Sequence, residues 1–74
     1  MVIFRPNIKN IKVELARNDL NITSLAKTIG YDVSYINLVV NGKKNPRLKT
    51  ASTIAKTLGV ELEYLFEIKE KEEK

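Results

Sequence analysis

The chain has 74 residues, of which 43% are hydrophobic, and a formal net charge of +4 at pH 7. This length supports one domain with a small core, which needs cross-links, a partner chain or regular helix packing for stability. Cys and His are both absent, which excludes disulfides and the usual zinc and haem ligands. Helix packing or oligomerisation therefore remains as the source of stability.

The apolar runs are only a few residues long, so none is expected to span a membrane. The first ten residues, "MVIFRPNIKN", lack the long apolar stretch of a signal peptide. Having no Cys also suits a reducing compartment. We therefore expect a cytoplasmic protein without a membrane association.

Charge is distributed unevenly along the chain. Residues 1–60 carry ten Lys or Arg against three acidic residues, whereas residues 61–74 carry three Lys against six Glu. Five basic residues and no acidic residue fall between positions 41 and 56. Such a cluster suits a polyanion such as DNA, although an ordinary solvated loop and helix face would have the same composition.

Apolar residues at helical spacing predict the first helix. It should begin near Pro6–Asn7, end around Asn18–Asp19 and bury Ile8, Ile11 and Leu15. Arg5 and Lys9 could form an arm that reaches DNA, but a frayed terminus is the simpler expectation.

The next two helices are short and clearly bounded. Asn21 and Gly30 are expected to cap the second helix at its two ends, and its apolar stripe is Ile22, Leu25, Ala26 and Ile29. Asp32 is expected to cap the third helix, which should stop at Asn41–Gly42, and its buried stripe is Ile36, Val39 and Val40. Pro46 then keeps the preceding residue out of the helical region, so "KKNP" is predicted to be a loop.

Two more helices complete the predicted pattern. The fourth has an apolar stripe of Leu48, Ala51, Ile54, Ala55 and Leu58 and should end at Gly59. The fifth has a stripe of Leu62, Leu65 and Phe66, to which Tyr64 and Ile68 add apolar surface, and part of that surface could serve as a dimer contact. Alternating strand patterns are short, so the prediction is an all-α domain of five helices over residues 1–67, followed by a charged C-terminal tail over residues 68–74.

Only "GYD" separates the second helix from the third, and a turn that short forces two helices to cross steeply. The stretches "LAKTIGYDVSYINLVVNGKKNP" and "TIAKTLGVELEYLF" together resemble the Cro/CI-type (XRE, lambda-repressor-like) helix-turn-helix family. The resemblance covers about residues 8 to 67, and its matching features are Leu25-Ala26, Gly30, Asp32, Ile36, Asn41-Gly42, Asn45-Pro46, Ala55, Leu58-Gly59-Val60 and Leu65.

The resemblance implies a five-helix lambda-repressor-like domain in which the third helix enters the major groove of double-stranded DNA. Members usually bind as dimers to half-sites about one turn, roughly 34 Å, apart. The positions that would contact bases are Val33, Ser34, Asn37 and Leu38, which also share one helix face by spacing. The positions that would contact phosphate are Asn41, Lys43, Lys44 and Arg47.

The sequence departs from the family pattern in ways that bear on function. Ile22 stands where the second helix commonly begins with a phosphate-binding Gln, and Val33 and Ser34 stand where Gln, Arg or Lys often contact bases. Recognition is therefore expected to rely on thymine methyl groups, an adenine edge at Asn37 and DNA shape. Leu15 and Val40 replace a frequent Arg–Glu pair, and such a joint replacement can be neutral or stabilising.

These features favour a sequence-specific transcriptional regulator, a repressor of phage or mobile-element type, that acts as a homodimer. The alternative is a protein-interaction module on the same fold, such as an anti-repressor or an adaptor with a regulatory protein partner, because the exposed face of the third helix is largely apolar. No enzyme, cofactor or metal is expected, since the chain has no His, no Cys and no phosphate-binding Gly loop.

Overall fold

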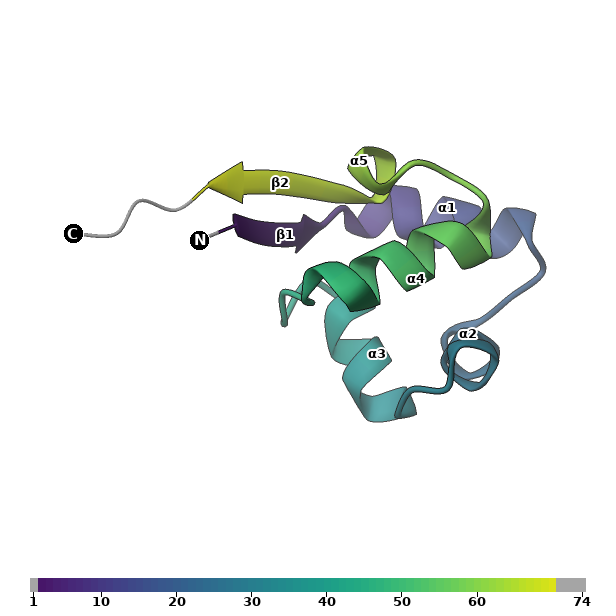
Figure 1. Ribbon diagram of the computed structural model, residues 1–74. Helices are drawn as coiled ribbons and strands as arrows, with labels where there is room; N and C mark the ends of the chain where they lie inside the picture. Colours follow the sequence, from purple (N-terminus) through teal and green to yellow (C-terminus); the bar gives the residue numbers. More distant parts are fainter. Residues whose placement is uncertain (1, 71–74) are drawn as a thin grey trace.

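A computed structural model of the chain describes residues 2–70. Along the chain, the elements are β1 (Val2–Pro6), α1 (Ile8–Arg17), α2 (Ile22–Ile29), α3 (Val33–Val40), α4 (Leu48–Leu58), α5 (Leu62–Leu65) and β2 (Phe66–Glu70). In Figure 1, α4 crosses the middle of the molecule, with α1 and α5 on one side and α2 and α3 on the other. The two strands run side by side and project beyond the helices.

The predicted helix boundaries in the first half of the chain are confirmed. Asn21 and Ser24 form a reciprocal capping box at the start of α2, with the Asn21 side chain accepting from the Ser24 backbone N–H at 2.8 Å. The Asp32 carboxylate accepts from the Ser34 backbone N–H at 2.8 Å and so caps α3. Gly30 and Gly59 end α2 and α4 in the left-handed conformation.

One apolar core joins all seven elements and follows the predicted stripes closely. Its buried residues are Phe4, Ile11, Leu15, Leu25, Ala26, Ile36, Val39, Val40, Ala51, Ile54, Ala55, Leu58, Leu65 and Phe66. Of the predicted stripes, Ile22, Ile29 and Leu62 are partly buried against this core, and two residues are exposed. Leu48 is 57% exposed because it is the first residue of α4, and Ile8, the first residue of α1, is also exposed.

The prediction of an all-α domain is wrong in one respect, because the chain also contains a two-stranded antiparallel sheet. β1 and β2 pair in the register Val2↔Glu70, Phe4↔Ile68 and Pro6↔Phe66. The fifth helix is correspondingly shorter than predicted. It has four residues, and Phe66, which was expected in its stripe, begins β2.

The sheet forms because each strand has one apolar face that the helices alone would not cover. Phe4 and Phe66 point into the core, and Phe66 is 1% exposed. The alternation of Phe66 and Ile68 with Glu67 and Lys69 has the two-residue period of a strand. The pairing joins the two ends of the chain, however, and no local pattern reports a partner that distant in sequence.

These strands also correct two expectations about the ends of the chain. Arg5 lies in β1 and Lys9 in α1, so the expectation of a frayed terminus is wrong for both. Residues 68–70 of the expected charged tail belong to β2, and residues 71–74 lie outside the described part of the chain.

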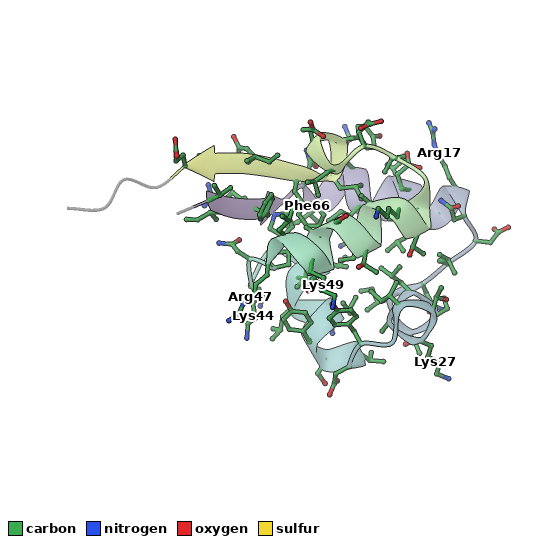
Figure 2. All side chains as sticks on the ribbon, in the orientation of Figure 1. Arg17, Lys27, Lys44, Arg47, Lys49 and Phe66 are labelled. Atoms are coloured by element: carbon green, nitrogen blue, oxygen red, sulfur yellow. The ribbon has the colours of Figure 1, made fainter. Side chains whose placement is uncertain are left out.

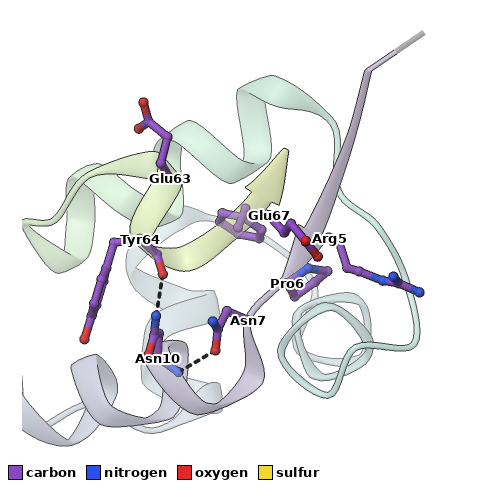
Figure 3. Close-up of a pocket in the computed structure, with 8 residues that line it drawn as sticks. Arg5, Pro6, Asn7, Asn10, Glu63, Tyr64 and Glu67 are labelled. Carbon is purple, nitrogen blue, oxygen red and sulfur yellow. Dashed lines mark hydrogen bonds between the residues drawn. The ribbon is translucent and has the colours of Figure 1, made fainter. Parts of the chain in front are cut away.

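Polar contacts fasten α5 to the start of α1 (Figure 3). The Asn10 Nδ2 group donates to the Tyr64 carbonyl oxygen at 2.7 Å, and the Asn7 backbone N–H donates to the Leu65 carbonyl oxygen at 2.7 Å. Asn7 also caps α1, since its Oδ1 accepts from the Asn10 backbone N–H at 3.0 Å. Together these bonds hold α5 against the first turn of α1.

None of the helices within residues 2–70 has the length and apolar character that a membrane-spanning helix needs.

The sheet is expected to be a structural part of the core. Phe66→Ala should lower the free energy of unfolding by about 3–5 kcal/mol, because it empties a fully buried aromatic site. Phe66→Leu keeps most of the volume and should cost less than about 1.5 kcal/mol. Ile68→Ala, on the same strand face but 44% exposed, is the matched control. Urea unfolding followed by circular dichroism measures all three, and equal losses at positions 66 and 68 would contradict this account.

Candidate nucleic-acid interface

The arrangement of α2 and α3 depends on a three-residue turn, Gly30–Asp32. Gly30 has φ 79°, and the Tyr31 backbone N–H donates back to the Ala26 carbonyl oxygen at 2.9 Å. Ala26 is fully buried, so its small side chain lets the two helices approach closely. In Figure 1, α2 is seen end-on while α3 runs across the view, which shows that the helices cross steeply.

Burial divides α3 into two faces. Ile36, Val39 and Val40 are fully buried against the other helices. The four positions that were expected to contact bases are all exposed on the other side, with Val33 36% and Leu38 42% accessible. The set comprises Val33, Ser34, Asn37 and Leu38. The structure therefore brings the predicted set together on one solvent-facing surface.

Asn37 and Asn41 form a hydrogen-bonded pair along this surface. The Asn41 Nδ2 group donates to the Asn37 carbonyl oxygen at 2.9 Å and to the Asn37 side-chain Oδ1. This contact orients the Asn37 carboxamide before any ligand arrives, and its Nδ2 group makes no hydrogen bond within residues 2–70. An amide oxygen accepts two hydrogen bonds, so the Asn37 Oδ1 retains capacity for a second donor.

The loop between α3 and α4 carries the three predicted basic contacts. Lys43, Lys44 and Arg47 are all exposed, and Figure 2 shows Lys44 and Arg47 extending to the same side. Gly42 opens the loop with φ 74°, and a Cβ at this position would lie 2.9 Å from Ile8 Cδ1. The close approach of Gly42 to Ile8 holds the start of the loop against α1.

Loop and helix meet at a shallow surface depression beside the end of α3. Its lining residues are Asn37, Leu38, Asn41 and Lys43. The predicted base contacts Asn37 and Leu38 of α3 thus border the same depression as the predicted phosphate contacts Asn41 and Lys43, which follow α3. Lys27 and Arg17 lie elsewhere, on α2 and at the end of α1 (Figure 2).

Two stacked tyrosines connect the turn, α3, the basic loop and α4. Tyr31 of the turn and Tyr35 of α3 stack with ring centroids 6.0 Å apart and an interplanar angle of 21°. The Thr50 hydroxyl of α4 donates to the Tyr31 hydroxyl oxygen at 3.1 Å, and the Lys44 Nζ lies 5.5 Å above the Tyr35 ring. The turn, α3, the basic loop and α4 are therefore linked in one chain of contacts.

The sequence analysis did not identify the contacts of Tyr31 with Tyr35 and Thr50. Tyr35 is half-buried, and it stacks on Tyr31. Tyr31 lies in the turn before α3, so the i, i+4 rule for residues on one helix did not indicate its contact with Tyr35. The hydroxyl partner Thr50 lies 19 residues from Tyr31, so only the fold identifies it.

Three of the residues that depart from the Cro/CI-type pattern lie at a separate groove between α1 and α2. Leu15 and Val40 are both buried in the core, and together with half-buried Ile22 they border this groove. An apolar contact in place of a charge pair therefore fits the observed packing. Ile22 packs against the core and presents no hydrogen-bonding group at the start of α2. Within residues 2–70 no group of three or more acidic side chains could hold a metal ion.

The sequence matches the helix-turn-helix family model over residues 11–65, a range that includes every predicted contact position. Among solved structures, the chain is similar to the crystal structure of "a putative DNA-binding protein" from Bacteroides fragilis. The two share 28% sequence identity with a TM-score of 0.68, over 93% of this chain and 100% of that chain. No curated protein matches the sequence.

The Tyr31–Thr50 hydrogen bond is expected to stabilise the interface measurably. Tyr31→Phe should lower the free energy of unfolding by about 1 kcal/mol, because it removes a partly buried hydrogen bond and keeps the ring stack. Tyr35→Phe is the control, since the Tyr35 hydroxyl makes no hydrogen bond within the described residues. A double-mutant cycle with Thr50→Val, measured by urea unfolding, tests the coupling. Strictly additive losses in that cycle would show that the bond contributes nothing.

Proposed function

The chain belongs to the helix-turn-helix family, and from this membership we propose that it is a sequence-specific regulator of transcription that places α3 in the major groove of double-stranded DNA. One observation carries the proposal. The exposed face of α3 and the basic loop after it border a single depression at Asn37, Leu38, Asn41 and Lys43. A groove-binding helix needs phosphate contacts at its flank, and the loop supplies them there.

Affinity in this proposal comes chiefly from the loop. Lys43, Lys44 and Arg47 are exposed and free to approach phosphates, and binding them would release counterions from the DNA. Asn41 lies at the end of α3, where the Gly42 backbone also becomes accessible. In the free protein, Lys44 rests over the Tyr35 ring, which keeps its ammonium group beside the recognition helix.

Specificity would come from the outer face of α3. Val33 and Leu38 offer methyl groups that fit the C5-methyl of thymine, and Ser34 can bond a base or a phosphate. Asn37 can donate through Nδ2 and accept through Oδ1, the pair of contacts that adenine requires. Because this face has no Arg and few directional groups, DNA shape and flexibility would contribute much of the discrimination.

The type of regulator and its oligomeric state are inferred from the resemblance to the Cro/CI-type family. We propose a repressor of phage or mobile-element type that acts as a homodimer on two half-sites about one helical turn apart. Bound over a promoter, such a dimer would exclude the transcription machinery. A regulatory protein partner that covers the apolar residues Val33 and Leu38 would compete with DNA for the same face.

The loop charges should determine how steeply DNA binding falls with salt. Lys44→Ala combined with Arg47→Ala should weaken binding to random duplex DNA, and the slope of log K against log salt should become shallower by about 0.9 for each phosphate that the protein no longer neutralises. Arg17→Ala combined with Lys56→Ala removes the same charge from the last turns of α1 and α4 and should change the slope little. Fluorescence anisotropy titrations at several salt concentrations measure both.

The same titration separates DNA binding from a protein-interaction role. If the wild-type protein binds no duplex DNA at low salt, the DNA-binding proposal fails. The alternative is then a module that uses Val33 and Leu38, which are exposed on α3, to contact another protein.

Asn37 and Lys44 should have distinguishable roles on DNA. Asn37→Ala should cost about 1–3 kcal/mol mainly at one base pair of the preferred site, because it removes a base contact. Lys44→Ala should weaken all sequences alike, because a phosphate contact carries no sequence information. Selection of a preferred site from random duplexes, followed by titration of single base-pair variants, measures the difference. Uniform losses for both substitutions would overturn the assignment of Asn37.

A further inference from the structure

Asn41 ends α3 in the way that Asn18 ends α1, with one additional contact. Each is the C-cap residue of its helix, and each donates from Nδ2 to the carbonyl oxygen four residues earlier, at 2.9 Å for Asn41 and 2.8 Å for Asn18. Of the two, only Asn41 also donates to the side chain at that earlier position, the Oδ1 of Asn37. Satisfying the carbonyl groups of a helix end does not require this second bond, because Asn18 caps α1 without it.

The backbone carbonyl fixes the orientation of both carboxamides. A carbonyl oxygen only accepts hydrogen bonds, so the Asn41 atom that lies 2.9 Å from the Asn37 carbonyl oxygen must be Nδ2. The same Nδ2 also meets the end of the Asn37 side chain, where its partner must then be the acceptor Oδ1. The Asn37 Nδ2 is thereby turned away from Asn41, and no hydrogen bond within residues 2–70 occupies it. Asn37 therefore presents a hydrogen-bond donor on the exposed face of α3.

This geometry leaves Asn41 without an unused donor for a phosphate. Both hydrogens of its Nδ2 go to Asn37, and its backbone N–H donates to the Asn37 carbonyl oxygen at 3.1 Å. The remaining side-chain atom, Oδ1, is an acceptor, as are the oxygens of a phosphate. The phosphate contact that the family resemblance implies for Asn41 would therefore require the pair to open.

We propose that Asn41 is a positioning residue for base recognition, which acts on DNA through Asn37 and not through phosphate. By holding Asn37 with Nδ2 outward, it makes Asn37 select a base that offers an acceptor in the major groove. Adenine, guanine and thymine each offer one, whereas cytosine offers only a donor. Adenine fits best, because the second lone pair of the Asn37 Oδ1 accepts from its N6 group. The inference rests on the proposed function, in which α3 lies in the major groove.

A carboxamide without this restraint would discriminate less. Turning an Asn side chain over exchanges its donor with its acceptor, so an unrestrained Asn37 would accept from cytosine as readily as it donates to guanine or thymine. Of the four exposed residues on this face, only Ser34 and Asn37 carry polar side chains, and a hydroxyl both donates and accepts. The orientation of Asn37 therefore determines the directional part of the readout, and fixing it in advance lowers the entropy lost on binding.

Substitution of Asn41 tests this role on DNA. The wild-type protein selects a preferred duplex from a random-sequence library, and fluorescence anisotropy then measures binding to its single base-pair variants. Asn41→Ala should lower the preference at the base pair that Asn37→Ala identifies by roughly ten-fold. In the double variant Asn37→Ala/Asn41→Ala, the loss of Asn41 should have no further effect on that preference. Asn18→Ala, which loses the same kind of carbonyl bond on α1, is the matched control and should leave the preference unchanged.

Asn41→Asp reverses the orientation with little change in side-chain size. An ionised carboxylate only accepts hydrogen bonds, so Asn37 should turn over, donate to it from Nδ2 and present Oδ1 to the base. Cytosine should then be preferred to guanine and thymine at this base pair. The readout is the ratio of affinities, because the added negative charge weakens binding to all sequences alike. Thermal unfolding followed by circular dichroism shows that each variant is folded.

Nuclear magnetic resonance of the free protein tests the orientation without DNA. Scalar couplings across hydrogen bonds should join the Asn41 Nδ2 nitrogen to the carbonyl and Cγ carbons of Asn37. A coupling from the Asn37 Nδ2 to the Asn41 Cγ would overturn the inference. The same base preference in the wild type, Asn41→Ala and Asn41→Asp, with a uniform loss of affinity, would equally overturn it and make Asn41 a phosphate contact. Failure of the proposed function gives a different result, in which the wild-type protein binds no duplex DNA at low salt.

Discussion

Three side chains of α3, Ile36, Val39 and Val40, are completely buried, and their burial determines the orientation of everything else on that helix. A chain with no disulfide and no metal ligand of the usual kinds has little besides apolar burial to stabilise it. Because these three residues must face the core, the opposite side of α3 must face solvent. The tight turn at Gly30 then fixes the angle at which that outer side is presented.

The remaining polar contacts refine the position of this surface. The stack of Tyr31 on Tyr35, with its hydroxyl bond to Thr50, ties the turn to α4. Lys44 joins the same chain of contacts through the Tyr35 ring. A protein that binds a rigid duplex benefits when the helix and its flanking loop are positioned in advance, since less conformational entropy is then lost on binding. In the proposed regulator, the same contacts would serve both stability and recognition.

The sheet, whose β1 strand lies beside the loop before α4, has a separate role in the proposed regulator. It closes the core over Phe4 and Phe66 and leaves the acidic side chains Glu67 and Glu70 on a strand that projects beyond the helices. The basic loop follows α3, whereas this acidic strand follows α5 at the end of the described part of the chain. The division also explains the uneven charge distribution along the sequence.

Most of the helical architecture and the membership of the two faces of α3 were predictable from the sequence alone, because caps, glycine stops and apolar spacing are local signals. Asn21, Gly30 and Asp32 act as such signals, and so does the stripe at Ile36, Val39 and Val40. Only the tertiary structure revealed the β1–β2 pairing, the Tyr31–Thr50 bond and the contact of Asn37 with Asn41. The first two join residues far apart in the chain, and the third depends on side-chain orientation. Local periodicity encodes which face of an element is buried, whereas the partner that meets it is decided by how the whole chain packs.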